Sequence, residues 1–252
     1  MKTIGIIGGM SWTSTAEYYR LLNEQVTARL SHLDEGGLES PPILLHSLNF
    51  AEVVAMQRAG QWEAAGELLA RAGAGLERAG ADCLLVATNT MHKVAPAIEA
   101  ATSVPLLHIA DATGAAIRAA GLSRVGLLAT AFTMEQDFYR ERLARHGIEV
   151  IVPEAAERAE VHRVIFEELC CNLVRPESHA FYQWTMGNLV SAGAEGIILG
   201  CTEIMLLVGQ EDTTVPVFDT TALHVAAAVN FVLGDDPAAD RTAVPAETTA
   251  PA

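Results

Sequence analysis

Ile4-Gly5-Ile6-Ile7-Gly8, near the start of the chain, has a counterpart in Val125-Gly126-Leu127-Leu128-Ala129. Likewise, Cys83-Leu84-Leu85-Val86-Ala87-Thr88-Asn89-Thr90 has a counterpart in Gly196-Ile197-Ile198-Leu199-Gly200-Cys201-Thr202-Glu203. The copies lie about 110 to 120 residues apart, which is typical of a duplicated unit. We therefore expect two similar lobes related by a pseudo-two-fold axis, on which Thr88 would oppose Cys201.

Composition places the chain among globular proteins. It has 252 residues, of which 50% are hydrophobic and 19% are charged, and its length suits two lobes of about 110 residues each. No apolar run reaches the roughly 18 residues that a membrane span needs. Met1-Lys2-Thr3 leads directly into an apolar strand, so we expect no signal peptide and a cytoplasmic protein.

Charge and cysteine spacing argue against two classes of ligand. The net charge is -15 and the 16 Lys and Arg residues form no dense run, which argues against a nucleic-acid partner. The four cysteines include no Cys-x-x-Cys pair, which argues against a zinc site, and we expect no metal. In a cytosolic protein such cysteines are buried fillers or nucleophiles more often than disulfides.

Short apolar runs alternate with helical stretches, which predicts an α/β fold with mostly parallel sheets flanked by helices. The predicted strands are Thr3 to Ile7, Pro42 to Ser47, Cys83 to Ala87, Leu106 to Ile109, Val125 to Ala129, Glu149 to Val152, Gly196 to Leu199 and Val217 to Phe218. The clearest predicted helices are Thr13 to Leu30, capped by Ser11 or Thr13, Trp62 to Ala79, Ala112 to Ala120, Pro176 to Ala192 and Leu223 to Leu233.

The predicted domain division places residues 1–110 and 220–235 in the first lobe and residues 111–219 in the second. In this arrangement the last helix returns to the first lobe. Residues 236–252 are rich in Pro, Ala and Thr and bury too little apolar surface to order, so we expect a disordered tail.

Every unusual polar cluster follows a predicted strand. In open parallel sheets, ligands bind beyond the carboxyl ends of the strands. The clusters are Gly8-Gly9-Met10-Ser11, Thr88-Asn89-Thr90-Met91-His92, Thr130-Ala131-Phe132-Thr133 and Cys201-Thr202-Glu203. Their shared position predicts a ligand site in the cleft between the lobes.

Each cluster also has a structural interpretation. Gly8-Gly9-Met10-Ser11 forms either a plain tight turn or a loop whose amides bind a carboxylate, and it is not a Gly-x-Gly-x-x-Gly nucleotide motif. Thr88-Asn89-Thr90 caps the next helix or binds substrate; Asn89 has both a donor and an acceptor for a zwitterionic amino acid.

Cys201 is the strongest candidate for a catalytic group. It follows a strand and precedes Thr202-Glu203, which we predict to begin a helix, and a helix N-terminus lowers the pKa of a thiol. Cys83 and the Cys170-Cys171 pair are predicted to be structural. Among His92, His108 and His224, which are also candidates for core residues, His92 is the one we expect to support the site.

At these positions the chain resembles the aspartate/glutamate racemase family. The motifs that carry the resemblance are Ile6-Ile7-Gly8-Gly9-Met10-Ser11-Trp12, Ala87-Thr88-Asn89-Thr90-Met91-His92-Lys93, Leu106-Leu107-His108-Ile109-Ala110-Asp111-Ala112-Thr113, Phe132-Thr133-Met134-Glu135-Gln136-Asp137-Phe138-Tyr139, Gly200-Cys201-Thr202-Glu203-Ile204 and Val215-Pro216-Val217-Phe218-Asp219-Thr220. The resemblance implies cofactor-independent racemization of aspartate or glutamate in a cleft between two lobes, and a homodimer.

Most members of the family place a cysteine in each lobe, one as the base and one as the acid. Here Thr88 occupies the first-lobe position, as in the L-aspartate/glutamate-specific subgroup, so catalysis falls to Cys201 and Thr88. A threonine hydroxyl can pass on a proton but hardly acts as a free base, and we expect preferred turnover of the L-enantiomer. The substrate-binding residues that the resemblance implies are Met10, Asn89, Thr90, Thr130, Thr133 and Thr202.

Two other functions fit parts of the sequence. A decarboxylase of the same superfamily needs one cysteine to protonate a carbanion, although Asn89, Thr90 and Thr133 favour an amino acid as substrate. A non-catalytic amino-acid sensor would have no need of Cys201. Relative to the family, the chain also carries an insertion, Ser31 to Glu35, whose acidic residues would alter access for acidic substrates.

Overall fold

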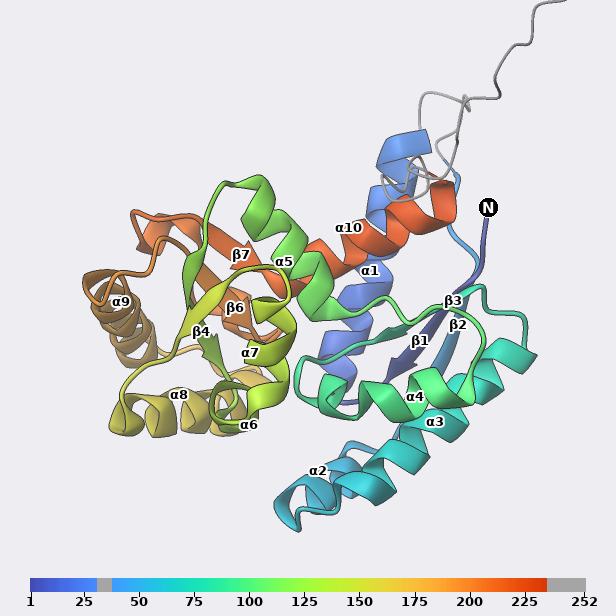
Figure 1. The fold of residues 1–252 in the computed structure, drawn as a ribbon, viewed down its shortest axis with the longest axis horizontal. Coiled ribbons are helices and arrows are strands. Elements are labelled where there is room, and N and C mark those ends of the chain that lie inside the picture. Colours follow the sequence, from blue (N-terminus) through green and yellow to red (C-terminus); the bar gives the residue numbers. More distant parts are fainter. Residues whose placement is uncertain (31–37, 235–252) are drawn as a thin grey trace, which may run out of the picture.

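The computed structural model describes residues 1–30 and 38–234 and consists of two α/β lobes (Figure 1). The inserted loop Ser31 to Glu35 and the predicted tail, residues 236–252, lie outside the described residues. The elements, in chain order, are β1 (Ile4–Gly8), α1 (Trp12–Leu30), β2 (Ile43–Ser47), α2 (Phe50–Arg58), α3 (Trp62–Arg78), β3 (Cys83–Val86), α4 (Ala95–Ala101), α5 (Ile109–Ala119), β4 (Arg124–Ala129), α6 (Ala131–Glu135), α7 (Asp137–Ala144), β5 (Glu149–Ile151), α8 (Ala155–Glu167), α9 (Pro176–Ser191), β6 (Ile197–Gly200), β7 (Val217–Asp219) and α10 (Thr220–Leu233).

Both sheets are parallel, and three strands of each follow the same order. The sheet of the first lobe has the order β2-β1-β3, and that of the second lobe has the order β5-β4-β6-β7. The repeated segments therefore form equivalent strands: β1 and β4 are central, and β3 and β6 lie beside them. The predicted two-lobed α/β fold is confirmed.

The predicted strand Leu106 to Ile109 is wrong in length. Leu106 makes a single parallel bridge with Leu84, and the chain enters α5 at Ile109. The reason is a helix cap that the apolar pattern conceals: His108 Nδ1 accepts a hydrogen bond from the backbone N–H of Ala110 (3.2 Å). A capped helix start replaces the end of the strand.

Apolar residues from the strands fill a core on each face of the first sheet. One core joins the sheet to α1 and α10 through Tyr18, Leu22 and Val229, and the other joins it to α2, α3 and α4. The last helix thus returns to the first sheet, and Figure 1 shows α10 beside α1. A third core fills the second lobe around β4 and β6.

The turn after β1 requires a glycine. Gly9 has φ +85°, and a Cβ there would lie 2.2 Å from the backbone oxygen of Leu48. A side chain would therefore be strained both by the backbone conformation and by the contact. Within the described residues, no helix is both long and apolar enough to span a membrane.

Three buried histidines meet where η1 (Thr90–Val94), the start of α5 and α10 come together. The ring of His92 lies 4.5 Å from that of His108 and 5.7 Å from that of His224. His224 Nε2 donates to the backbone oxygen of Leu107 (2.6 Å), so its Nδ1 accepts from the Tyr18 hydroxyl (2.8 Å). Burial lowers the pKa of His224 to about 4 and that of His108 to about 3, and it also lowers the pKa of His92.

These lowered pKa values predict a loss of stability at mildly acidic pH. Below about pH 6.5 the unfolded chain binds protons at these rings while the folded protein does not. The contribution of the neutral rings to stability is therefore complete above about pH 6.5. As the pH falls from there toward 4, His108 and His224 each lower the free energy of unfolding by about 1.4 kcal/mol per pH unit, and His92 acts in the same direction. Urea unfolding at pH 7, 6 and 5 measures this slope.

The substitution His108→Asn separates titration from capping, because asparagine also accepts from a helix N–H. The slope in this variant is expected to be smaller by about 1.4 kcal/mol per pH unit. The control is His46→Asn, at an exposed position, which should leave the slope unchanged. An unchanged slope in His108→Asn would contradict the assignment.

Candidate active site

A cavity lies between the lobes, beyond the carboxyl ends of β1, β3 and β6. Its lining residues are Met10, Ser11, Phe50, Gln57, Thr88, Asn89 and Thr90 of the first lobe and Phe166, Cys170, Gly200, Cys201, Thr202 and Glu203 of the second. Six of the eight predicted site residues are among them. The volume of about 30 Å³ is room for a water or two, so the lobes are closely packed around the site in this structure.

One hydroxyl bridge between the lobes starts at Ser14 in the first turn of α1. Its Oγ donates to the backbone oxygen of Ala87 (2.8 Å) and accepts from Thr202 Oγ1 (2.8 Å). Ala87 precedes Thr88, and Thr202 follows Cys201. Ser14 therefore holds the backbone of the residue before Thr88 and the side chain of the residue after Cys201.

A second hydroxyl bridge is made by Thr220, the first residue of α10. Its Oγ1 donates to the backbone oxygen of Leu199 in β6 (2.9 Å) and accepts from Asn89 Nδ2 (3.0 Å). The two bridges resemble each other, since each runs from the first turn of a helix to the ends of β3 and β6. Thr88 and Cys201 are thereby held from both sides.

Asn89 leaves a buried acceptor without a partner. Thr220 has a single hydroxyl proton, which goes to Leu199, so the Asn89 nitrogen must face Thr220. Its Oδ1 then points elsewhere, and it is buried without a hydrogen-bond partner among the described residues. Because such atoms are costly to leave unpaired, this oxygen is suited to accept from a substrate ammonium.

The predicted binding threonines separate into two roles. Thr90 lines the cavity, and its hydroxyl lies 2.9 Å from that of Thr130 and 3.2 Å from that of Thr133. Thr130 and Thr133 are buried and are not among the cavity-lining residues. The second lobe thus orients Thr90 through this triangle of hydroxyls.

The expected lowering of the Cys201 pKa is wrong. The segment after Cys201 forms a three-residue 3-10 turn, Ile204–Leu206, so no α-helix begins there. Burial raises the pKa of the thiol, and the Glu203 carboxylate, which accepts from Cys201 Sγ at 3.0 Å, raises it further. The backbone N–H of Glu203 favours the thiolate but does not offset these effects. In this closed arrangement Cys201 is a protonated thiol.

Glu203 has a role that its local sequence does not predict. Its Oε1 accepts from Ser11 Oγ (2.7 Å) and Thr13 Oγ1 (3.4 Å), while its Oε2 accepts from Cys201. Ser11 Oγ also accepts from the N–H of Ser14, which confirms Ser11 as the cap of α1. The carboxylate thus lies at the N-terminus of α1, where the helix dipole favours negative charge.

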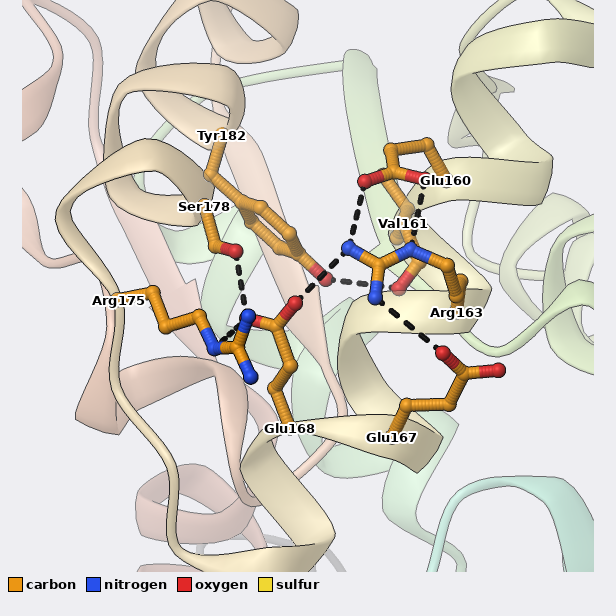
Figure 2. A network of polar contacts seen from close by, with 8 residues as sticks. All are labelled: Glu160, Val161, Arg163, Glu167, Glu168, Arg175, Ser178 and Tyr182. Atoms are coloured by element: carbon orange, nitrogen blue, oxygen red, sulfur yellow. Dashed lines mark hydrogen bonds and ion pairs between the residues drawn. The ribbon is translucent and has the colours of Figure 1, made fainter.

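Cys170 also departs from its predicted structural role, because it lines the cavity. Burial, with Glu203 and Cys171 nearby, raises its pKa to about 12. The turn that carries it, Leu169–Cys171, is held by the buried Glu168, which accepts from Arg163 (2.8 Å) and Ser178 (2.6 Å) (Figure 2). Position in the tertiary structure, and not local sequence, brings this thiol to the site.

His92 supports the backbone of Thr88. Its Nδ1 donates to the backbone oxygen of Thr88 (2.8 Å), and its Nε2 accepts from the N–H of Ile109 (3.3 Å). Its lowered pKa keeps the ring neutral. Cys83, in contrast, lies in a buried strand away from the cavity, and burial raises its pKa to about 12.

The fold and site define a two-lobed α/β protein in which a cysteine and a threonine from equivalent strand ends line one cavity. Residues 7–228 match the family described as Asp/Glu/Hydantoin racemase. The chain belongs to this family.

Two solved structures show the same architecture. A putative Asp/Glu racemase from Yersinia pestis is 50% identical, with a TM-score of 0.86 over 92% of this chain and 100% of its own. An aspartate racemase homologue from Pyrococcus horikoshii OT3 is 35% identical, with a TM-score of 0.77 over 94% of this chain and 100% of its own. A curated relative, the broad specificity amino-acid racemase RacX of Bacillus subtilis, is 27% identical over 63% of this chain and 68% of its own length.

The contact between Cys201 and Glu203 predicts that the carboxylate controls thiol acidity. Glu203→Gln removes a negative charge and should lower the pKa of Cys201, because the thiolate then forms without like-charge repulsion. The measurement is the pH midpoint of Cys201 alkylation by iodoacetamide, followed by peptide mass spectrometry. Glu211→Gln, at an exposed position of the same lobe, is the control. A midpoint that stays unchanged or rises in Glu203→Gln would contradict the prediction.

Proposed function

We propose that the protein racemizes an amino acid without a cofactor, by removing the proton from the α-carbon on one face and returning a proton on the other. One observation carries the proposal: Cys201 and Thr88 end equivalent strands in different lobes and line the same cavity. A substrate α-carbon between them is reached from opposite faces. Membership of a racemase family supports this reaction.

The acid-base steps follow from the contacts of Cys201. To act as a base, the thiol first gives its proton to Glu203, whose Oε2 already accepts from it. The thiolate then takes the α-proton, and Thr88 gives its hydroxyl proton to the opposite face of the carbanion. Water returns a proton to the Thr88 oxygen and takes one from Glu203, which restores the starting state. A positioned group of this kind contributes about 10² to 10⁴-fold to the rate.

The substrate groups have partners in the cavity. Asn89 Oδ1 would accept from the ammonium, and the hydroxyls of Thr90 and Thr202, together with the turn at Met10, would hold the carboxylate. Aspartate and glutamate, preferentially as L-enantiomers, are the substrates that the family resemblance implies. The name of the Bacillus subtilis relative extends the candidates to other amino acids.

The first prediction of this mechanism concerns Cys201. Incubation with each of the common L-amino acids in heavy water should exchange the α-proton of at least one, as followed by NMR. In Cys201→Ala this exchange should fall by at least about 100-fold, because the base is lost. The matched control is Cys171→Ala, at an exposed cysteine that does not line the cavity. If the wild-type protein exchanged none of them at high concentration, the racemase proposal would fail.

The second prediction concerns the direction of turnover. Two enantiomers have equal free energies, so kcat/KM must be the same for the L- and the D-enantiomer. A preference for one of them can therefore appear only as a higher kcat that is matched by a higher KM. Because a threonine hydroxyl is a poor base, kcat from the L-enantiomer should exceed kcat from the D-enantiomer.

Thr88→Cys should bring the ratio of the two kcat values toward one, since a thiol can act as the second base. Thr88→Ser keeps a hydroxyl and should preserve the asymmetry. Polarimetry at saturating L- and D-substrate measures both constants. An asymmetry that survives in Thr88→Cys would remove Thr88 from its assigned role.

A further inference from the structure

The cavity lining divides into two groups by origin. One group follows the strand ends and includes Thr88, Asn89 and Cys201, which would serve the amino-acid core common to all substrates. The other comes from α2, with Phe50 and Gln57, and from α8 and its following turn, with Phe166 and Cys170. Figure 1 shows α2 and α8 on the same side of the molecule, one from each lobe. This second group remains for the substrate side chain.

The second group is uncharged. Phe50 and Phe166 present aromatic rings, and Cys170 keeps its proton at neutral pH because its pKa is about 12. Gln57 presents an amide whose Nε2 donates to Met91 Sδ (3.0 Å). These groups suit an apolar side chain or one that ends in an amide or hydroxyl.

The charge at the cavity is negative. Among the described residues that line the cavity, Glu203 is the one with a charged side chain. Arg163 of α8 is bound by Glu160 (2.8 Å), Glu167 (3.3 Å) and Glu168 (2.8 Å), as Figure 2 shows. Its charge is therefore already paired.

Two further arginines near the cavity are also paired. Arg175 lies 4.0 Å from Glu168 (Figure 2). Arg20 lines an open pocket that shares Thr202 and Glu203 with the cavity, and it bonds Glu17 and Glu24. A substrate carboxylate would have to compete for Arg163, Arg175 and Arg20 with the carboxylates that already bind them.

We propose that the site selects an amino acid with an uncharged side chain over aspartate and glutamate. A second substrate carboxylate would lose its hydration in the closed cavity and would lie near the carboxylate of Glu203. This inference rests on the proposed racemase function. It departs from the acidic substrates that the family resemblance implies.

Isosteric substrate pairs test the proposal with the wild-type protein. L-asparagine and L-aspartate, or L-glutamine and L-glutamate, have nearly the same size and differ in charge. For a pair that the protein turns over, kcat/KM for α-proton exchange in heavy water should be at least about tenfold higher for the amide than for the acid. Exchange of the acid that equals or exceeds that of its amide would overturn the proposal. Exchange of no amino acid at all would overturn the racemase function, and this inference with it.

A charge introduced at Phe166 provides an independent test. Phe166 is half-buried in the last turn of α8, where a cation is favourable and a lysine stem can replace part of the ring. Phe166→Lys should shift the ratio of acid to amide exchange toward the acid by at least about tenfold. Phe166→Met, which changes shape without charge, should not shift it. An equal shift in both variants, or in neither, would contradict the placement of the substrate side chain.

Discussion

The site depends on two hydroxyl groups that each bond both lobes. Ser14 connects the backbone of Ala87 to Thr202, and Thr220 connects Asn89 to the backbone of Leu199. A hydroxyl can donate one hydrogen bond and accept another at the same time, so a single side chain can hold two strand ends close together. The two residues therefore hold the strand ends that carry Thr88 and Cys201 at one cavity.

The sequence predicts the fold well because the decisive information is local and repeated. Glycine-punctuated apolar runs identify β1, β3, β4 and β6, and the rule that parallel sheets bind ligands at carboxyl ends places Thr88 and Cys201 at one site. Leu106 to Ile109 is an exception. The apolar run there predicts a strand, yet the side chain of His108 caps a helix and so ends the strand.

The chemistry of the site is less predictable because it depends on groups brought together by folding. The acidity of Cys201 depends on burial and on a carboxylate two residues away whose orientation is set by Ser11 in the other lobe. Cys170 reaches the cavity because Glu168 anchors its turn to α8 and α9. Neither contact has a signal in local sequence, whereas Glu203 could have been suspected from its spacing to Cys201.

Glu203 also connects the contact between the lobes to the hydrogen bonding of Cys201. Its two oxygens bond to different lobes, Oε1 to Ser11 and Oε2 to Cys201. Separation of the lobes would break the contacts of Oε1 with Ser11 and Thr13, but the contact of Oε2 with Cys201 lies within one lobe and could persist. The carboxylate that accepts from the catalytic candidate is therefore also a contact between the lobes, so any change in lobe position alters the hydrogen bonding next to Cys201.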